Sequence, residues 1–192
     1  MDACDSILRK YLENLQLQQN VIDEVLACFV TRHYAKKDYF SFTGETNDKL
    51  GFVINGLFCM YIETEEGTIF TKDFIDNQRF LLATFDPVTE NLATIQALKD
   101  AVILEAKYSD IQRLFDKYPE FELLARKRTE KEVASIYERL ETFALMEAKE
   151  RYRLFKQKYG NIESEIPLYL IASYLGITPT QLSRIRSKKE ST

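Results

Sequence analysis

The sequence predicts an α+β protein with an N-terminal antiparallel β jelly-roll barrel, one long helix after it and a C-terminal helix-turn-helix unit. Three observations lead to this prediction. Short apolar and aromatic runs separated by close turns fill residues 39–106, as in barrels and jelly rolls. A stretch free of Gly and Pro begins after Pro119 and continues to about Lys158. Residues 166–189 combine two short helical patterns with a glycine between them.

Helices are expected before the barrel and directly after it. Residues 5–29 have apolar side chains at helical spacing in two short segments, and Asn20 is a candidate cap for the second. From about Thr31 the pattern changes to strands, and residues 109–118 are again helical. The strand-like runs are residues 39–42, 51–56, 57–64, 68–75, 92–98 and 101–106.

The long helix has an apolar stripe at the spacing of a coiled-coil seam. Val133, Ile136, Leu140, Phe143 and Glu147 advance by three, four, three and four residues. We therefore expect a homodimer joined through the first four of these residues; packing against the chain's own barrel is the alternative. The expected domains are residues 1–118 for the barrel with its N-terminal helices, 119–147 for the dimerisation helix and 148–192 for DNA binding.

The first helix of the C-terminal pair is defined by one apolar face and by its end signals. Pro167 suits a first helical position, and Gly176 allows the sharp turn that must follow. The apolar face consists of Leu168, Ile171, Ala172 and Leu175. A second helix must start at Thr178 and Pro179, because Thr178 is a good N-cap and Gln181 at N3 completes a capping box.

The second helix has a hydroxyl-rich and basic outer side. Leu182 and Ile185 fall on one face and are expected to pack inward. The other residues are of the types that contact base edges and phosphates. We assign DNA binding to Thr178, Thr180, Gln181, Ser183, Arg184, Arg186 and Lys188. An ordinary αα-hairpin with a solvated basic face is the alternative.

The charge distribution favours double-stranded DNA as the partner. The whole chain has a formal net charge of −4. Residues 149–192 nevertheless contain nine Lys and Arg against four Glu, whereas the first 148 residues contain 17 against 26 acidic residues. The positive charge is therefore concentrated where the helix pair lies.

The cysteines and the termini predict a cytoplasmic protein without a membrane partner. Cys4, Cys28 and Cys59 are far apart and odd in number, which argues against a disulfide framework and against a zinc site. No apolar run approaches the roughly eighteen residues of a membrane span, and the N-terminus lacks the pattern of a signal peptide.

The order of parts resembles the Crp/Fnr family of bacterial transcription regulators. In the barrel the resemblance rests on residues 36–40, 43–45, 52–57 and 66–67, and at the C-terminus on residues 171–186. It implies a cyclic-nucleotide-binding-like barrel, a winged-helix-like DNA-binding domain and a homodimer that contacts DNA and RNA polymerase. Arg184 matches an Arg that contacts a base or a phosphate in the family.

The chain departs from this family at the effector site. Members that bind cyclic nucleotides have a Gly-Glu pair and an Arg followed by a small hydroxyl residue. The corresponding residues 79–95 contain no Gly and no Arg after Arg79, and Glu90 adds a negative charge. We expect no cyclic AMP binding, no cofactor and no iron–sulfur cluster. Arg79 and Glu90 are weak candidates for contacts to an unknown small-molecule effector.

Two other classes of function are weighed against a regulator. Metal-dependent enzymes with similar barrels need several His ligands, and this chain has only His33, so neither an enzyme nor a metal site is expected. A ligand-sensing or protein-interaction adaptor that does not bind DNA remains the alternative. Its barrel pocket would be lined by aromatic residues that are more often core: Phe52, Phe58, Tyr61, Phe70, Phe74, Phe80 and Phe85.

Overall fold

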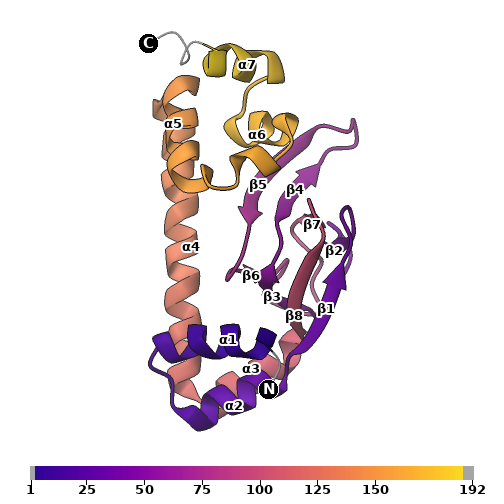
Figure 1. Ribbon diagram of the computed structural model, residues 1–192, viewed down its shortest axis with the longest axis vertical. Helices are drawn as coiled ribbons and strands as arrows, with labels where there is room; N and C mark the ends of the chain where they lie inside the picture. Colours follow the sequence, from indigo (N-terminus) through magenta and orange to yellow (C-terminus); the bar gives the residue numbers. More distant parts are fainter. Residues whose placement is uncertain (1–2, 188–192) are drawn as a thin grey trace. The chain divides into compact units, whose positions relative to one another are not determined.

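The computed structural model in Figure 1 describes residues 3–187. The chain divides into two compact units. Met1–Met60 and Phe74–Glu130 form the first, here called the sheet unit, and Tyr61–Asp73 and Lys131–Thr192 form the second, here called the C-terminal unit. This division differs from the expected domains, because the hairpin between β4 and β5 belongs with the C-terminal helices and not with the other strands.

The strands form two four-stranded sheets. One has the order β1-β8-β3-β6 and the other the order β2-β7-β4-β5, and β8 pairs antiparallel with both β1 and β3. The bounds are β1 Val30–Tyr34, β2 Tyr39–Ser41, β3 Leu50–Asn55, β4 Phe58–Glu63, β5 Ile69–Ile75, β6 Phe80–Leu81, β7 Thr94–Ala97 and β8 Ala101–Ala106. The sequence missed β1 as a separate strand, because it has no buried residue, and β6, because it has only two residues.

One core of the sheet unit lies between the two sheets. Val53 and Ile103 face it from β3 and β8, and Phe40, Phe58 and Ile95 face it from β2, β4 and β7. All five side chains are at most 1% exposed, so the protein's own side chains fill the space between the sheets. This packing follows from the alternation of a strand, in which successive residues point to opposite faces.

A second core covers the other face of the first sheet. Phe52 and Leu104, each next to a residue of the first core, face α1, α2 and α3. These helices span Ala3–Asn14, Gln19–Ala27 and Tyr108–Lys117, and Figure 1 shows them gathered beside the start of α4. Asn20 does not cap α2, which begins at Gln19 after Gln18 and has no side-chain cap.

The long helix is shorter than the sequence suggested. α4 spans Pro119–Leu145, two residues intervene, and α5 spans Ala148–Tyr159. The backbone of Glu147 is extended, with ψ 158°, and the guanidinium of Arg151 donates to the carbonyl oxygen of Met146 at 2.7 Å. This side-chain hydrogen bond, between residues five positions apart, satisfies a carbonyl that a continuous helix would use, so the break needs neither Gly nor Pro.

The C-terminal unit ends in a bundle of short helices. After the 3-10 turn Glu163–Glu165 come α6 Leu168–Leu175 and α7 Pro179–Ser187. Pro167 is the residue before α6 and not its first residue, since its backbone is extended with ψ 137°. Residues 148–187 contain no strand, so the wing of a winged helix is not found in this described segment. No helix of the described chain has the length and apolar character needed to cross a bilayer.

Candidate nucleic-acid interface

The turn between α6 and α7 requires a glycine for two independent reasons. Gly176 has φ 64° and ψ 40°, the left-handed conformation that ends many helices. The N–H of Ile177 donates to Ala172 at 3.0 Å and closes the last turn of α6. A Cβ at position 176 would also lie 2.6 Å from the ring of Phe143. The predicted turn at Gly176 is therefore confirmed.

The start of α7 is the predicted capping box. The N–H of Thr178 donates to the side-chain oxygen of Gln181 at 2.9 Å, and the N–H of Gln181 donates to the hydroxyl of Thr178 at 3.2 Å. Pro179 is the first residue of the helix, as expected. The cap fixes the direction in which α7 leaves the turn.

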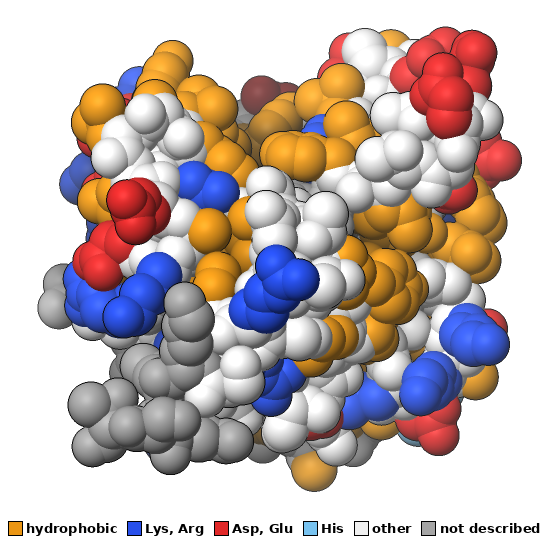
Figure 2. All heavy atoms as spheres, turned by 90° about the horizontal axis from the view of Figure 1, so that it is seen from above, with side chains coloured by type: hydrophobic (Ala, Val, Ile, Leu, Met, Phe, Trp, Pro, Cys, Tyr) orange, Lys and Arg blue, Asp and Glu red, His pale blue; other side chains and the backbone are white. Residues whose placement is uncertain are grey.

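α7 is anchored on one side and exposed on the other. Leu182 is fully buried, as predicted, whereas Ile185 is only half-buried. The exposed residues are Thr178, Thr180, Gln181, Ser183, Arg184 and Arg186. Figure 2 views the molecule from above and shows Lys and Arg side chains on this side among hydrophobic and acidic ones. Lys188 lies outside the described residues.

The two arginines of α7 have different surroundings. Arg186 lies 3.9 Å from the carboxylate of Glu163, which also accepts a hydrogen bond from the hydroxyl of Tyr152 at 2.6 Å. Burial, followed by this bond to Glu163, raises the pKa of Tyr152 to about 12. Arg184 has no ion pair within the described chain, so its guanidinium is the more readily available for an anionic partner.

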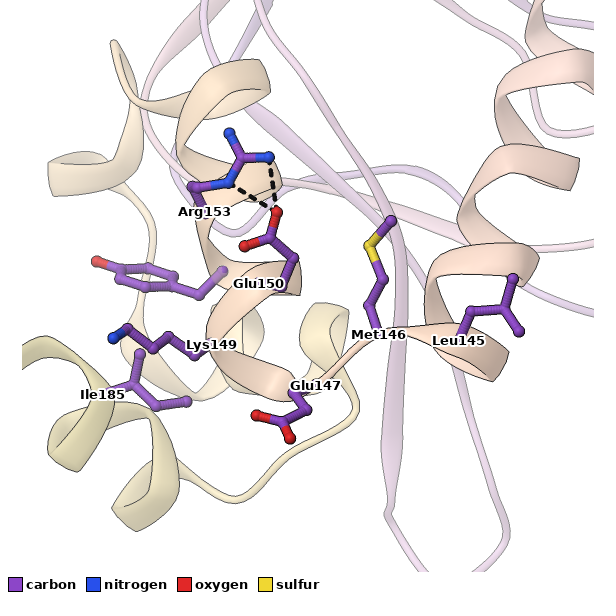
Figure 3. Close-up of a pocket in the computed structure, with 8 residues that line it drawn as sticks. Leu145, Met146, Glu147, Lys149, Glu150, Arg153 and Ile185 are labelled. Carbon is purple, nitrogen blue, oxygen red and sulfur yellow. Dashed lines mark hydrogen bonds and ion pairs between the residues drawn. The ribbon is translucent and has the colours of Figure 1, made fainter.

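A pocket of about 480 Å³ explains why Ile185 is only half-buried. Leu145 and Met146 lie at one side of it, and residues of α5 at the other. Figure 3 shows Ile185 approaching α5 from α7 beside Lys149, while Arg153 and Glu150 form an ion pair at 2.6 Å. The pocket separates Ile185 from the end of α4, so the inward face of α7 is anchored mainly by Leu182.

The hairpin of β4 and β5 is hydrogen-bonded to both α6 and α5. The hydroxyl of Ser173 on α6 donates to Ile69 at 2.6 Å and accepts from the N–H of Thr71 at 2.9 Å. The hydroxyl of Tyr159 on α5 donates to Asp73, which also lies 3.6 Å from Lys158. Burial and this carboxylate raise the pKa of Tyr159 above its usual range. The sequence missed these residues, since nothing in their spacing links β5 to helices about a hundred residues later.

The apolar stripe of α4 is exposed in the single chain. No residue of this 27-residue helix is buried, and Val133, Ile136 and Leu140 are 44%, 61% and 58% exposed. Phe143 differs from the other three, because it is half-buried and its ring lies against Gly176. Tyr137, next to Ile136, is also exposed.

The candidate effector residues are not brought together in a binding site. Arg79 donates to the carbonyl oxygen of Phe74 at 2.7 Å, whereas Glu90 is exposed on the segment between β6 and β7. Of the aromatic candidates, four are buried, Phe80 is half-buried and two are exposed. The buried ones are Phe52, Phe58, Tyr61 and Phe74, and the exposed ones are Phe70 and Phe85.

The described residues contain neither a metal-binding cluster nor a disulfide. No three His, Cys, Asp or Glu side chains within residues 3–187 are grouped so that they could hold a metal ion. Cys4, Cys28 and Cys59 form no disulfide.

Comparison with solved structures places this fold among known regulators. FixK2 from Bradyrhizobium japonicum matches with a TM-score of 0.78 and 16% identity over 85% of each chain. CLP from Xanthomonas campestris, described as a c-di-GMP-responsive global regulator, matches with 0.73 and 14% identity over 91% of this chain and 92% of that one. CooA from Carboxydothermus hydrogenoformans matches with 0.70 and 20% identity over 93% and 83%.

These matches define the class of fold. The chain has the fold of the Crp/Fnr transcription regulators, the resemblance that its sequence motifs indicated. No family model matches the sequence, and no curated protein matches it. The similarity to this class is therefore visible in the fold and in short motifs.

Proposed function

We propose that this chain is a homodimeric, sequence-specific DNA-binding transcription regulator of the Crp/Fnr type. In this proposal α6 and α7 form the helix-turn-helix, and α7 is the recognition helix that enters the major groove. The two sheets close into a jelly-roll sensor barrel that does not take cyclic AMP. RNA polymerase is a further partner, and an unidentified small-molecule effector is left open.

The proposal rests on how α7 is anchored, capped and exposed. One apolar residue, Leu182, anchors the helix, and the capping box fixes its start. The opposite side exposes hydroxyl, amide and guanidinium groups, which pair with the donors and acceptors of base edges. The second helix of an ordinary αα-hairpin does not need both a capping box at its start and an outer side made only of exposed polar groups.

Dimerisation is supported by the exposure of α4. The stripe of Val133, Ile136, Leu140 and Phe143 has the repeat of a two-stranded coiled coil, and its first three residues are exposed. The same stripe of a second copy is its natural partner under two-fold symmetry. Two recognition helices related in this way contact half-sites about 34 Å apart, one turn of DNA.

Selection from random duplexes, followed by titration of the enriched sequence, tests the proposal. We expect a near-palindromic site that binds about a thousandfold or more tightly than a scrambled duplex, with affinity falling steeply as salt rises. Lys131→Ala provides a control, since Lys131 is an exposed basic residue of α4 that lies outside both α7 and the stripe. Equal binding to all duplexes, or none, would contradict the proposal.

One observation favours the adaptor as a second candidate. Phe85, Val88 and Leu92 are 59%, 83% and 65% exposed on the irregular segment between β6 and β7. Exposed apolar side chains in one segment are typical of interaction sites. An adaptor would fail the duplex selection yet lose its partner when these residues are replaced by polar ones.

A further inference from the structure

Arg139 on α4 binds two other segments of the C-terminal unit. One terminal nitrogen of its guanidinium donates to the carbonyl oxygen of Lys72 at 2.5 Å. The other donates to Thr71 at 2.8 Å and to Tyr174 at 2.9 Å. One side chain therefore joins α4 to β5 and to α6, the first helix of the proposed helix-turn-helix.

Aromatic rings enclose this guanidinium. Its central carbon lies 3.9 Å from the centroid of the Tyr174 ring and 5.3 Å and 5.4 Å from those of Phe143 and Phe70. Burial lowers the pKa of Arg139, and its Nε is buried without a hydrogen-bond partner within the described chain. Only a planar, delocalised cation can stack on a ring and donate to three carbonyls at once, so lysine cannot replace it.

The hairpin reaches α6 by a second route that does not involve Arg139. Ser173 bonds Ile69 and Thr71, and Tyr159 bonds Asp73. β5, α5 and α6 are thus held together as one support, and Arg139 is the residue that attaches this support to α4. Phe143, one turn further along α4, packs against the turn that leads into α7.

We propose that Arg139 is a positioning residue that sets the half-site spacing accepted by the dimer, through its hydrogen bonds to Thr71, Lys72 and Tyr174. This inference rests on the proposed function. Arg139 directly precedes Leu140 of the stripe, so the same turn of α4 presents the dimer contact and the attachment of the helix-turn-helix. The angle between stripe and recognition helix, and hence the separation of two recognition helices, depends on this attachment.

Spacing is a sensitive measure of that angle. One added base pair moves a half-site by about 3.4 Å and turns it by about a tenth of a full turn around the duplex axis. A rigid pair of recognition helices cannot follow both changes, whereas a loosened pair can. Loss of positioning therefore widens the range of accepted spacings, while the contacts of each helix with its own half-site stay the same.

The test measures affinities for duplexes that contain the selected half-sites at the optimal spacing, at one and two base pairs more or fewer, and for a single half-site. We expect the wild type to lose about tenfold or more for each added or removed base pair. Arg139→Ala should bind the single half-site within about twofold of wild type and lose most of the spacing preference. Arg139→Lys, which keeps the charge, should not restore it. Lys131→Ala, which removes an exposed basic residue of the same helix outside the stripe, should retain the wild-type profile.

The outcomes separate the two proposals. An unchanged spacing profile in Arg139→Ala, or full rescue by Arg139→Lys, overturns the positioning role alone. Equal affinity of the wild type for one and for two half-sites overturns the dimeric function and the positioning role with it. If Arg139→Ala does not fold, Ser173→Ala serves in its place, since it removes only the two hydrogen bonds between hairpin and α6. It should also broaden the spacing profile, and a wild-type profile would contradict the role of this support.

Discussion

Thr178 and Gln181 cap each other at the start of α7, through hydrogen bonds of 2.9 Å and 3.2 Å. The side-chain oxygen of Gln181 that accepts from Thr178 is the oxygen that would accept from the amino group of adenine. Gln181 can therefore contact adenine with both ends of its amide only if this oxygen serves the cap and the base together, or leaves the cap on binding.

The first prediction concerns the stability of α7. Thr178→Ala removes the hydroxyl that accepts the N–H of Gln181 and should lower the free energy of unfolding by about 1 kcal/mol. Thr180→Ala, an exposed threonine two residues later, should change it by less than about 0.5 kcal/mol. Urea unfolding followed by circular dichroism measures both. Equal effects of the two substitutions would show that the cap does not stabilise α7.

The second prediction distinguishes base contacts from phosphate contacts. Arg184→Ala should cost about 1–3 kcal/mol at the selected site and flatten the preference at one base pair, because a guanidinium pairs with the two acceptors of guanine. Lys188→Ala should weaken all duplexes alike and lower the salt slope by about one. Titrations on cognate and scrambled duplexes at several salt concentrations measure this. Equal weakening of both duplexes by Arg184→Ala would make Arg184 a phosphate contact.

The third prediction concerns the dimer. Ile136→Glu places a charge in the middle of the exposed stripe of α4 and should convert the dimer to a monomer at micromolar concentration, as measured by light scattering. Ala134→Glu introduces the same charge at a neighbouring exposed position outside the stripe and should leave the dimer intact. A wild-type monomer that still binds the palindromic site tightly would contradict the interface.

The fourth prediction concerns cyclic AMP. Calorimetry should detect no binding at micromolar nucleotide, and the nucleotide should not change DNA affinity, because an effector acts only through a difference in affinity between two conformations. The structural reasons are that Arg79 is engaged with the carbonyl oxygen of Phe74 and that the space between the sheets is filled. If a micromolar site appears, Arg79→Ala will show whether Arg79 is an unrecognised phosphate ligand.

The fifth prediction is a loss of stability at alkaline pH. The pKa of Tyr152 is about 12 in the folded protein against 10.0 in its ordinary state. Between these values the folded chain keeps a proton that the unfolded chain releases. Stability is therefore complete below pH 10 and falls as pH rises, by up to about 1.4 kcal/mol per pH unit for this group.

Tyr152→Phe tests this assignment. It should reduce the slope of unfolding free energy against pH between about pH 10 and 12, measured by urea unfolding. Tyr34 and Tyr159, whose pKa values burial also raises, should maintain the remainder of the slope. Tyr39→Phe, at an exposed position of β2, is the control and should keep the wild-type slope. An unchanged slope in Tyr152→Phe would refute the assignment.

The sequence by itself determined the features that depend on neighbours along the chain. The left-handed turn at Gly176 and the reciprocal cap of Thr178 and Gln181 are local, because their atoms lie within a few residues of each other. Alternation within a strand is local too, and it separated Phe52 from Val53 onto opposite faces of the sheet. The order of these local signals also indicated the Crp/Fnr fold.

Only the tertiary structure decided the features that join distant segments. At the break after Leu145 the guanidinium of Arg151 donates both to Met146 and to Leu175 on α6, and no helix signal in the sequence announces the contact with α6. The β4–β5 hairpin belongs to the C-terminal unit, and Arg139 is hydrogen-bonded to Thr71 and Tyr174, which lie 68 and 35 positions away along the chain. Such contacts depend on which surfaces meet when the chain folds, and periodicity within one segment contains no information about its partner.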